Sequence, residues 1–135
     1  MCLIDRVLEC DEQSITCTTN SHRDPDNPLL ENGRLSCIVL IEYASQAAAI
    51  HAAFNRQEFT QGKPAYIGSV KNIKLYKENI ENLPELALQS VCLLANATGA
   101  VYEFIISERR HTKSTKELRT KYKIAEGQLN LVLPR

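Results

Sequence analysis

The sequence lacks an excess of charge of either sign, because 16 basic residues are balanced by 16 acidic ones over 135 residues. No long-range field therefore indicates nucleic acid or a membrane surface as a partner. The basic residues are nevertheless clustered, since the stretch 109–123 holds seven of them against the single acid Glu117. This stretch is either a solvent-exposed pair of strands or a docking patch for an acidic partner.

The sequence also lacks a Cys-x-x-Cys pair, and its cysteine count of five is odd. Both facts disfavour a metal site or a disulfide framework, and free cysteines among apolar residues behave as small hydrophobic side chains. The N-terminus has no basic region followed by a long apolar run, so we expect no secretory signal. These absences predict a cytoplasmic protein with no bound metal or other cofactor.

Apolar periodicity predicts two strands, one long helix and then four strands. The first 20 residues are typical of a hairpin with a polar turn at 11–13, and 21–34 is a loop rich in Pro, Asp and Asn. Further strands are expected at 66–76, 85–95, 100–107 and 117–133. The last stretch changes phase at Gly127, where we expect a β-bulge or bend. This order predicts one α+β domain over residues 1–135, with an antiparallel sheet covering the helix.

The helix is expected at 37–55 and is apolar on nearly every side, with Ser36 as a candidate N-cap. It is slightly short for a membrane span, and its alanines and central acid favour a buried core helix. Glu42 is its only charged residue, and a carboxylate is rarely buried without a partner or a chemical role. Ser45 and Gln46 share its face. These three residues form one narrow polar stripe on the apolar helix. The stripe predicts that Glu42 is a buried acid that is neutralised, hydrogen-bonded or used in chemistry.

Three segments read LIDRVLE at 3–9, NPLL at 27–30 and IEYASQA at 41–47. They resemble the LLDRVLE start, the EPFF segment and the IEALAQA helix motif of the hotdog-fold 3-hydroxyacyl-acyl-carrier-protein dehydratases. The resemblance covers nearly the whole chain. It implies a strongly bent antiparallel sheet wrapped around one central helix, in a dimer whose acyl-binding tunnels lie between the subunits.

In that family a histidine removes the α-proton of a 3-hydroxyacyl thioester, and the helix acid protonates the departing hydroxyl group. The resemblance implies the acid role for Glu42, with support from Gln46 and from backbone N–H groups at the helix N-terminus, which polarise the thioester carbonyl. Such an acid needs a raised pKa, which an apolar tunnel supplies by desolvation. The implied substrate is an acyl chain on acyl carrier protein or CoA, and the acidic carrier protein would meet the basic stretch 109–123.

The family's histidine has no counterpart at its usual place. The family loop reads approximately FFQGHFPGxPVMPG, whereas this loop is several residues shorter and has Asn32 and Gly33 where the Gly-His pair would stand. The shortened loop is similar to that of dehydratase-like proteins from gene clusters of the aryl polyene type. The candidate substrate-binding residues are Asn32, Gly33, Arg34 and Cys37. Among them, Arg34 could bind the phosphate of a phosphopantetheine arm.

Other polar residues are candidates for the place of the missing base. His22 could swing toward the helix start as a displaced base, or it is an exposed bystander. His51 is nine residues beyond Glu42, half a turn more than two whole turns, so it is predicted to be a structural histidine facing away from the acid. His111 reads as a surface residue. Asn27 or Asn32 could orient a water molecule or a thioester carbonyl.

These observations predict a dehydratase-like protein that acts on or binds acyl thioesters, with Glu42 as the acid. Two alternatives stay open. The first is a non-catalytic pseudo-dehydratase that completes a heterodimer with an active hotdog paralogue. The second is an acyl thioesterase in which Glu42 activates water. The expected assembly is a homodimer or a heterodimer with another hotdog subunit.

Overall fold

The computed structural model describes residues 2–56, 66–109 and 122–132. Its elements follow the predicted order of two strands, one helix and four strands. The predicted strand segment 117–121 lies outside the described residues. In chain order the elements are β1 (Arg6–Cys10), β2 (Ser14–Thr19), the 3₁₀ turns η1 (Ser21–Arg23) and η2 (Cys37–Val39), α1 (Leu40–Arg56), β3 (Tyr66–Leu75), β4 (Leu86–Ala95), β5 (Gly99–Glu108) and β6 (Lys123–Val132).

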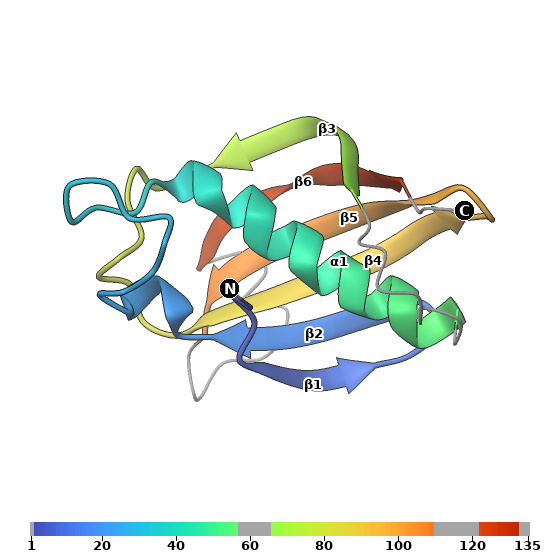
Figure 1. The fold of residues 1–135 in the computed structure, drawn as a ribbon, viewed down its shortest axis with the longest axis horizontal. Helices are drawn as coiled ribbons and strands as arrows, with labels where there is room; N and C mark the ends of the chain where they lie inside the picture. Colours follow the sequence, from blue (N-terminus) through green and yellow to red (C-terminus); the bar gives the residue numbers. More distant parts are fainter. Residues whose placement is uncertain (1, 57–65, 110–121, 133–135) are drawn as a thin grey trace.

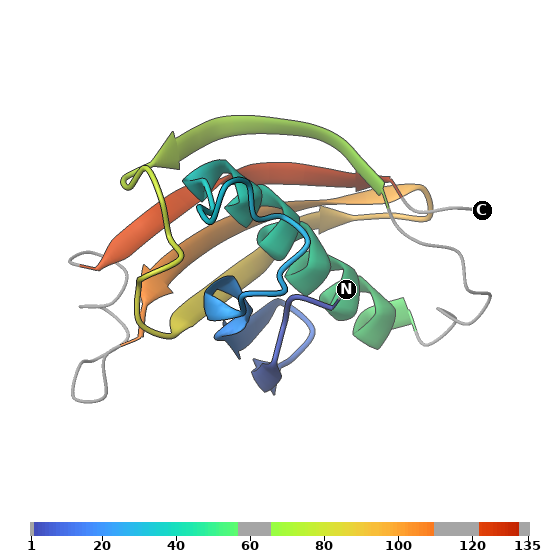
Figure 2. The same ribbon diagram turned by 60° about the vertical axis from the view of Figure 1, so that its left-hand side comes forward.

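The six strands form one antiparallel sheet in the order β1-β2-β4-β5-β6-β3. In Figure 1, α1 runs across one face of this sheet. Figure 2 shows the strands bending around the helix, with β3 curving over it at one edge. A bent sheet around one long helix is the expected hotdog fold, so the predicted α+β class is confirmed. β1 and β3 are the two edge strands.

The core lies between α1 and the inner face of the sheet. On β5, the buried residues Ala100, Tyr102, Phe104 and Ile106 alternate with less buried ones, as a strand with one covered face requires. The helix contributes a row of buried alanines, which allow its backbone to approach the sheet closely. The helix is apolar and long enough to cross a membrane, but here its apolar face packs on the sheet as a core helix.

The irregularity predicted at Gly127 is present in the pairing with β3, but it is not the cause of the phase change along β6. The phase change occurs at Ile124, which is the extra residue of β6 opposite β5, because Ile106 pairs with Ala125 while the next residue of β5 pairs with Lys123. Both Ile124 and Ala125 are therefore buried. Gly127 instead lies opposite a bulge in β3, where the pairing skips two residues between Lys71 and Lys74.

Candidate active site around Glu42

Glu42 lies in the first turn of α1, and its side chain is exposed to solvent. Among the described residues no group hydrogen-bonds to its carboxylate or forms an ion pair with it. The expectation of a buried acid is therefore wrong for this chain by itself. The physical reason is the helix period: Leu40, Ala44 and Ala47 are buried on the face toward the sheet, and a residue two positions after Leu40 points to the opposite side.

The polar neighbours of Glu42 on the helix bind backbone groups. The Ser45 hydroxyl donates a hydrogen bond of 2.8 Å to the backbone oxygen of Glu42. The side-chain oxygen Oε1 of Gln46 accepts a hydrogen bond of 2.7 Å from the backbone N–H of Leu3. Gln46 thus ties the N-terminal segment to α1, a use that the sequence did not predict. Its support of the Glu42 carboxyl group stays a prediction.

His22 is buried in η1, so the interpretation as an exposed bystander is wrong. Its Nε2 atom lies 2.8 Å from the carbonyl oxygen of Leu83 and 3.0 Å from that of Pro84, and Nε2 must therefore carry the proton. Its Nδ1 atom is buried without a partner among the described residues. Burial lowers the pKa of His22, while the two carbonyl hydrogen bonds act in the opposite direction. The structure brings no described histidine into contact with Glu42.

His51 is fully buried, as predicted for a structural histidine. Its Nδ1 atom lies 2.7 Å from the hydroxyl oxygen of Tyr102, and its Nε2 atom lies 2.8 Å from the backbone oxygen of Asp11. Both ring nitrogens are therefore used to hold α1 against β5 and the first hairpin. His111, the third histidine of the chain, lies outside the described residues.

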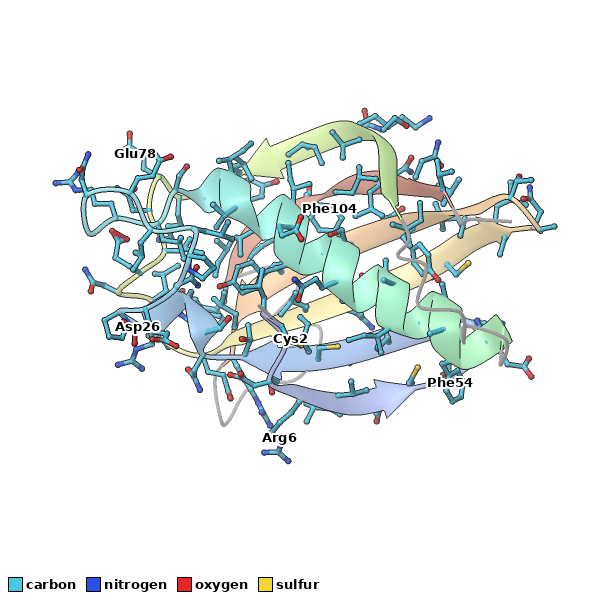
Figure 3. The ribbon with its side chains drawn as sticks, viewed as in Figure 1. Cys2, Arg6, Asp26, Phe54, Glu78 and Phe104 are labelled. Atoms are coloured by element: carbon cyan, nitrogen blue, oxygen red, sulfur yellow. The ribbon has the colours of Figure 1, made fainter. Side chains whose placement is uncertain are left out.

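The backbone donors at the start of the helix are already occupied. The N–H of Cys37 donates to the carbonyl oxygen of Glu78 at 2.8 Å, and Figure 3 shows Glu78 beside this end of the helix. The N–H of Ile38 donates to the Ser36 hydroxyl at 3.3 Å, which confirms Ser36 as a cap, and Val39 donates to the Ser36 carbonyl. These N–H groups therefore have acceptors within the chain itself, and their role in polarising a thioester carbonyl stays a prediction.

The segment 76–85 packs against the helix start. Besides the bond from Cys37, the N–H of Ile80 donates to the carbonyl of Leu35, and Ser36 forms an isolated bridge with Asn79. Ile80 is fully buried, so apolar packing holds this segment in place. The Cys37 side chain is buried too, and burial raises the pKa of its thiol.

Asn32 and Gly33 occupy the two central positions of a tight turn. Both have positive φ, +52° and +76°, and Glu31 and Arg34 exchange two backbone hydrogen bonds across the turn. An Asn-Gly pair is favoured there because both residues tolerate positive φ. Asn32, Gly33 and Arg34 are all exposed. The structure therefore places three of the candidate substrate-binding residues together at a loop tip, where their binding roles stay predictions.

A buried hydrogen-bond network behind Glu42 was not predicted. The Tyr43 hydroxyl lies 3.0 Å from the Ser21 hydroxyl and accepts a bond of 3.2 Å from the Asn27 amide. Ser21 also donates to the carbonyl of Leu3. Burial raises the pKa of Tyr43, although these two hydrogen bonds act in the opposite direction. Asn27 is thus buried in a structural role, and the lone phenol of the helix was the available signal for the network.

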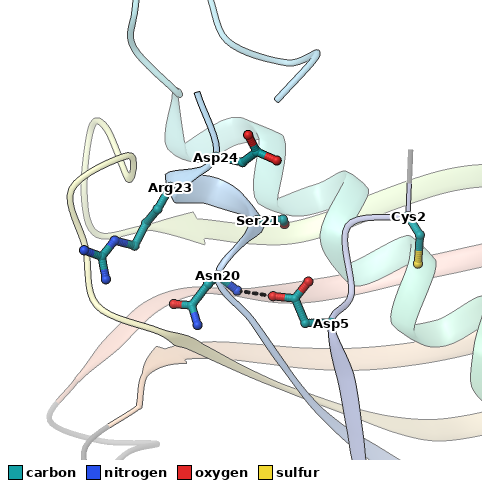
Figure 4. Close-up of a pocket in the computed structure, with 6 residues that line it drawn as sticks. All are labelled: Cys2, Asp5, Asn20, Ser21, Arg23 and Asp24. Atoms are coloured by element: carbon teal, nitrogen blue, oxygen red, sulfur yellow. Dashed lines mark hydrogen bonds between the residues drawn. The ribbon is translucent and has the colours of Figure 1, made fainter. Parts of the chain in front are cut away.

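An open hollow of about 450 Å³ lies beside the N-terminal segment and is lined by polar residues: Cys2, Asp5, Asn20, Ser21, Arg23 and Asp24. Figure 4 shows that the Asp5 carboxylate is engaged by the backbone of Asn20, at 2.6 Å. Glu42 does not line this hollow. Among the described residues no cluster of His, Cys, Asp and Glu has the geometry of a metal site.

Three comparisons place this geometry among known proteins. A family model described as ApeP-like, ApeP dehydratase, matches residues 1–135. No curated protein matches the chain in sequence. The solved dehydratase heterocomplex ApeI:P from Xenorhabdus doucetiae is similar in fold, with 19% sequence identity and a TM-score of 0.78, over 98% of this chain and 83% of that chain.

Two further solved structures share the fold at lower similarity. AziG from S. sahachiroi is 13% identical with a TM-score of 0.64, over 96% of this chain and 90% of that chain. A hypothetical thioesterase with coenzyme A from Streptococcus pneumoniae TIGR4 is 12% identical with a TM-score of 0.64, over 96% and 84% of the two chains. These likenesses establish the hotdog fold, and because the family model spans the whole sequence, the chain belongs to the ApeP-like dehydratase family.

Proposed function

We propose that this chain is the acid-bearing subunit of a two-chain 3-hydroxyacyl-acyl-carrier-protein dehydratase. One observation carries the proposal. Glu42 is exposed on the helix. The two described histidines, His22 and His51, are buried and hydrogen-bond to groups other than Glu42. An elimination needs a base as well as an acid, and within the described residues this chain brings no base to its acid. The base is therefore supplied by a second hotdog subunit.

The exposure of Glu42 also supports a partner. A carboxyl group that donates a proton near neutral pH needs a desolvated environment, which raises its pKa. Water surrounds Glu42 in the single chain, and an apolar subunit surface laid over α1 would exclude it. The partner's histidine then removes the α-proton, the carbon–carbon double bond forms, and the hydroxyl group leaves as water with the proton from Glu42.

The thioester carbonyl must be polarised by donors other than the occupied ones. Because Cys37 and Ile38 already donate to Glu78 and Ser36, we assign the carbonyl-binding N–H groups to the partner. A relative described as a dehydratase heterocomplex, ApeI:P, supports a division of the site between two chains. By the same similarity we propose a role in aryl polyene biosynthesis, with the acyl chain carried on acyl carrier protein.

The proposal is tested with 3-hydroxyacyl chains of several lengths on acyl carrier protein. The chain is assayed alone, and together with a hotdog subunit that carries an intact Gly-His-Phe-Pro loop, by following the 2-enoyl product. We expect product only from the pair. Glu42→Gln in this chain should lower the rate by at least a hundredfold, since a positioned acid contributes on the order of 10²–10⁴. Glu31→Gln, at the exposed hairpin turn, is the matched control and should leave the rate unchanged.

Other outcomes separate the alternatives. Product from the chain alone would refute the divided site. Full activity of the pair with Glu42→Gln would make this chain a non-catalytic partner. Release of free thiol, which dehydration does not produce, would support a thioesterase with Glu42 activating water.

A further inference from the structure

The edge strand β3 has an apolar face that the chain itself covers only in part. Ile67, Val70 and Leu75 pair with Leu131, Leu129 and Ala125, which are buried on the α1 side of the sheet. The three β3 residues point to the same side, yet all three are exposed. β3 is ten residues long, whereas the opposite edge strand β1 has only five. A long edge strand with a partly uncovered apolar row is a place where another strand can add.

The outward side of the same edge is basic. Lys71 pairs with Gln128 and Lys74 pairs with Glu126, both on the side away from α1. β3 itself carries no acidic residue. Glu126 lies on the inner neighbour β6, and its carboxylate is bound by Lys123, with Lys74 only at 4.0 Å and well exposed. The edge that a partner strand would meet therefore presents positive charge.

From these two observations we infer that β3 is an electrostatic selector, which rejects a second copy of this chain and accepts an edge strand bearing carboxylates. The inference rests on the proposed divided site only for the partner's identity as a second hotdog subunit. The apolar row supplies non-specific burial, and the lysines decide which strand is accepted.

The rejection of a second copy follows from strand geometry. In an antiparallel pair, opposed residues point to the same side, so the outward residues Ser69, Lys71 and Lys74 of one copy must oppose outward residues of the other. Consider the registers in which Lys71 or Lys74 of one copy lies opposite Ser69, Lys71 or Lys74 of the other copy. In each of these registers a lysine of one copy lies either directly opposite a lysine of the other copy or diagonally next to one. Like charges in such positions are destabilising, and carboxylates in the same positions are stabilising.

The charge rule can be tested with this chain alone. A Lys71→Glu/Lys74→Glu double variant is mixed with the wild type, and association is measured by sedimentation velocity at low and high salt. We expect each protein alone to stay monomeric, and the mixture to associate at least roughly tenfold more tightly, because two contacts change from repulsion to attraction. High salt should weaken the mixed complex.

Two controls isolate the charge effect. Lys71→Gln/Lys74→Gln removes the charge without reversing it. In a mixture with the wild type, this variant should therefore associate less tightly than the charge-reversal variant does. Arg6→Glu on the other edge, β1, should leave the mixing result unchanged. Circular dichroism checks that every variant is folded.

Two results would overturn the inference. A tight wild-type homodimer that is insensitive to salt would show that the lysines do not reject a second copy. A mixture no tighter than its components would show that the lysines only guard the edge against unwanted strand pairing. Neither result depends on the dehydration assay, so the failure of this inference is distinguishable from the failure of the divided site.

Discussion

The backbone N–H of Cys37 donates a 2.8 Å hydrogen bond to the carbonyl oxygen of Glu78. This bond joins the segment 76–85 to the start of the helix that carries Glu42, and it occupies a donor that the family resemblance assigned to the substrate. The chain therefore has an exposed carboxylate, Glu42, in the first turn of the helix, whereas the N–H groups of Cys37 and Ile38 at the helix start are already hydrogen-bonded. Both facts are consistent with a site divided between two subunits.

The occupied helix start predicts slow hydrogen exchange. The Cys37 amide is hydrogen-bonded next to a fully buried residue, Ile80, so it should exchange only through opening of the surrounding structure. We expect protection comparable to that of interior α1 amides, measured by NMR. The amide of exposed Asp26, which donates to the side chain of Asp24, is the control. Equal exchange of the two amides would mean that the helix start opens readily and can offer its donors to a thioester.

The burial of His22 predicts a stability loss in mild acid. Its pKa is lowered in the folded state by desolvation, so below the unfolded value of about 6.5 the unfolded chain binds more protons than the folded one. Unfolding free energy should therefore fall as pH decreases from 6.5, by at most about 1.4 kcal/mol per pH unit for one proton. Urea unfolding between pH 7.5 and 5.5 measures the slope.

The matched variant for this prediction is His22→Gln, whose amide can still donate to the Leu83 and Pro84 carbonyls. It should be less stable than the wild type at neutral pH but should show a shallower slope between pH 7.5 and 5.5. The same slope in the variant and the wild type would assign the acid sensitivity to other groups.

The close approach of Ile73 to Gly127 predicts that an added methyl group is not tolerated. A Cβ atom on Gly127 would collide with the Ile73 Cδ1 atom and lie 3.2 Å from its Cα atom. Gly127→Ala should therefore lower the free energy of unfolding by about 1–3 kcal/mol, the range for overpacking. Thermal or urea unfolding gives the value.

A double variant tests the cause. Ile73→Val removes Cδ1 but leaves the backbone contact, so it should recover part of the loss when combined with Gly127→Ala. Strictly additive losses would show that the two residues do not interact and that the sheet relaxes around the new methyl group.

The sequence by itself determined the order of the elements, the helix cap at Ser36 and the position of His51 on the helix side away from Glu42, because these depend on periodicity and on neighbours within one element. Its motifs also indicated the hotdog fold. Only the tertiary structure decided that Glu42 is exposed, since a helix that is apolar on nearly every side does not reveal which face the sheet covers. The burial of His22 and the bulge opposite Gly127 likewise depend on segments distant in the sequence. Local patterns specify elements, whereas the pairing of distant strands and loops decides which side chains meet.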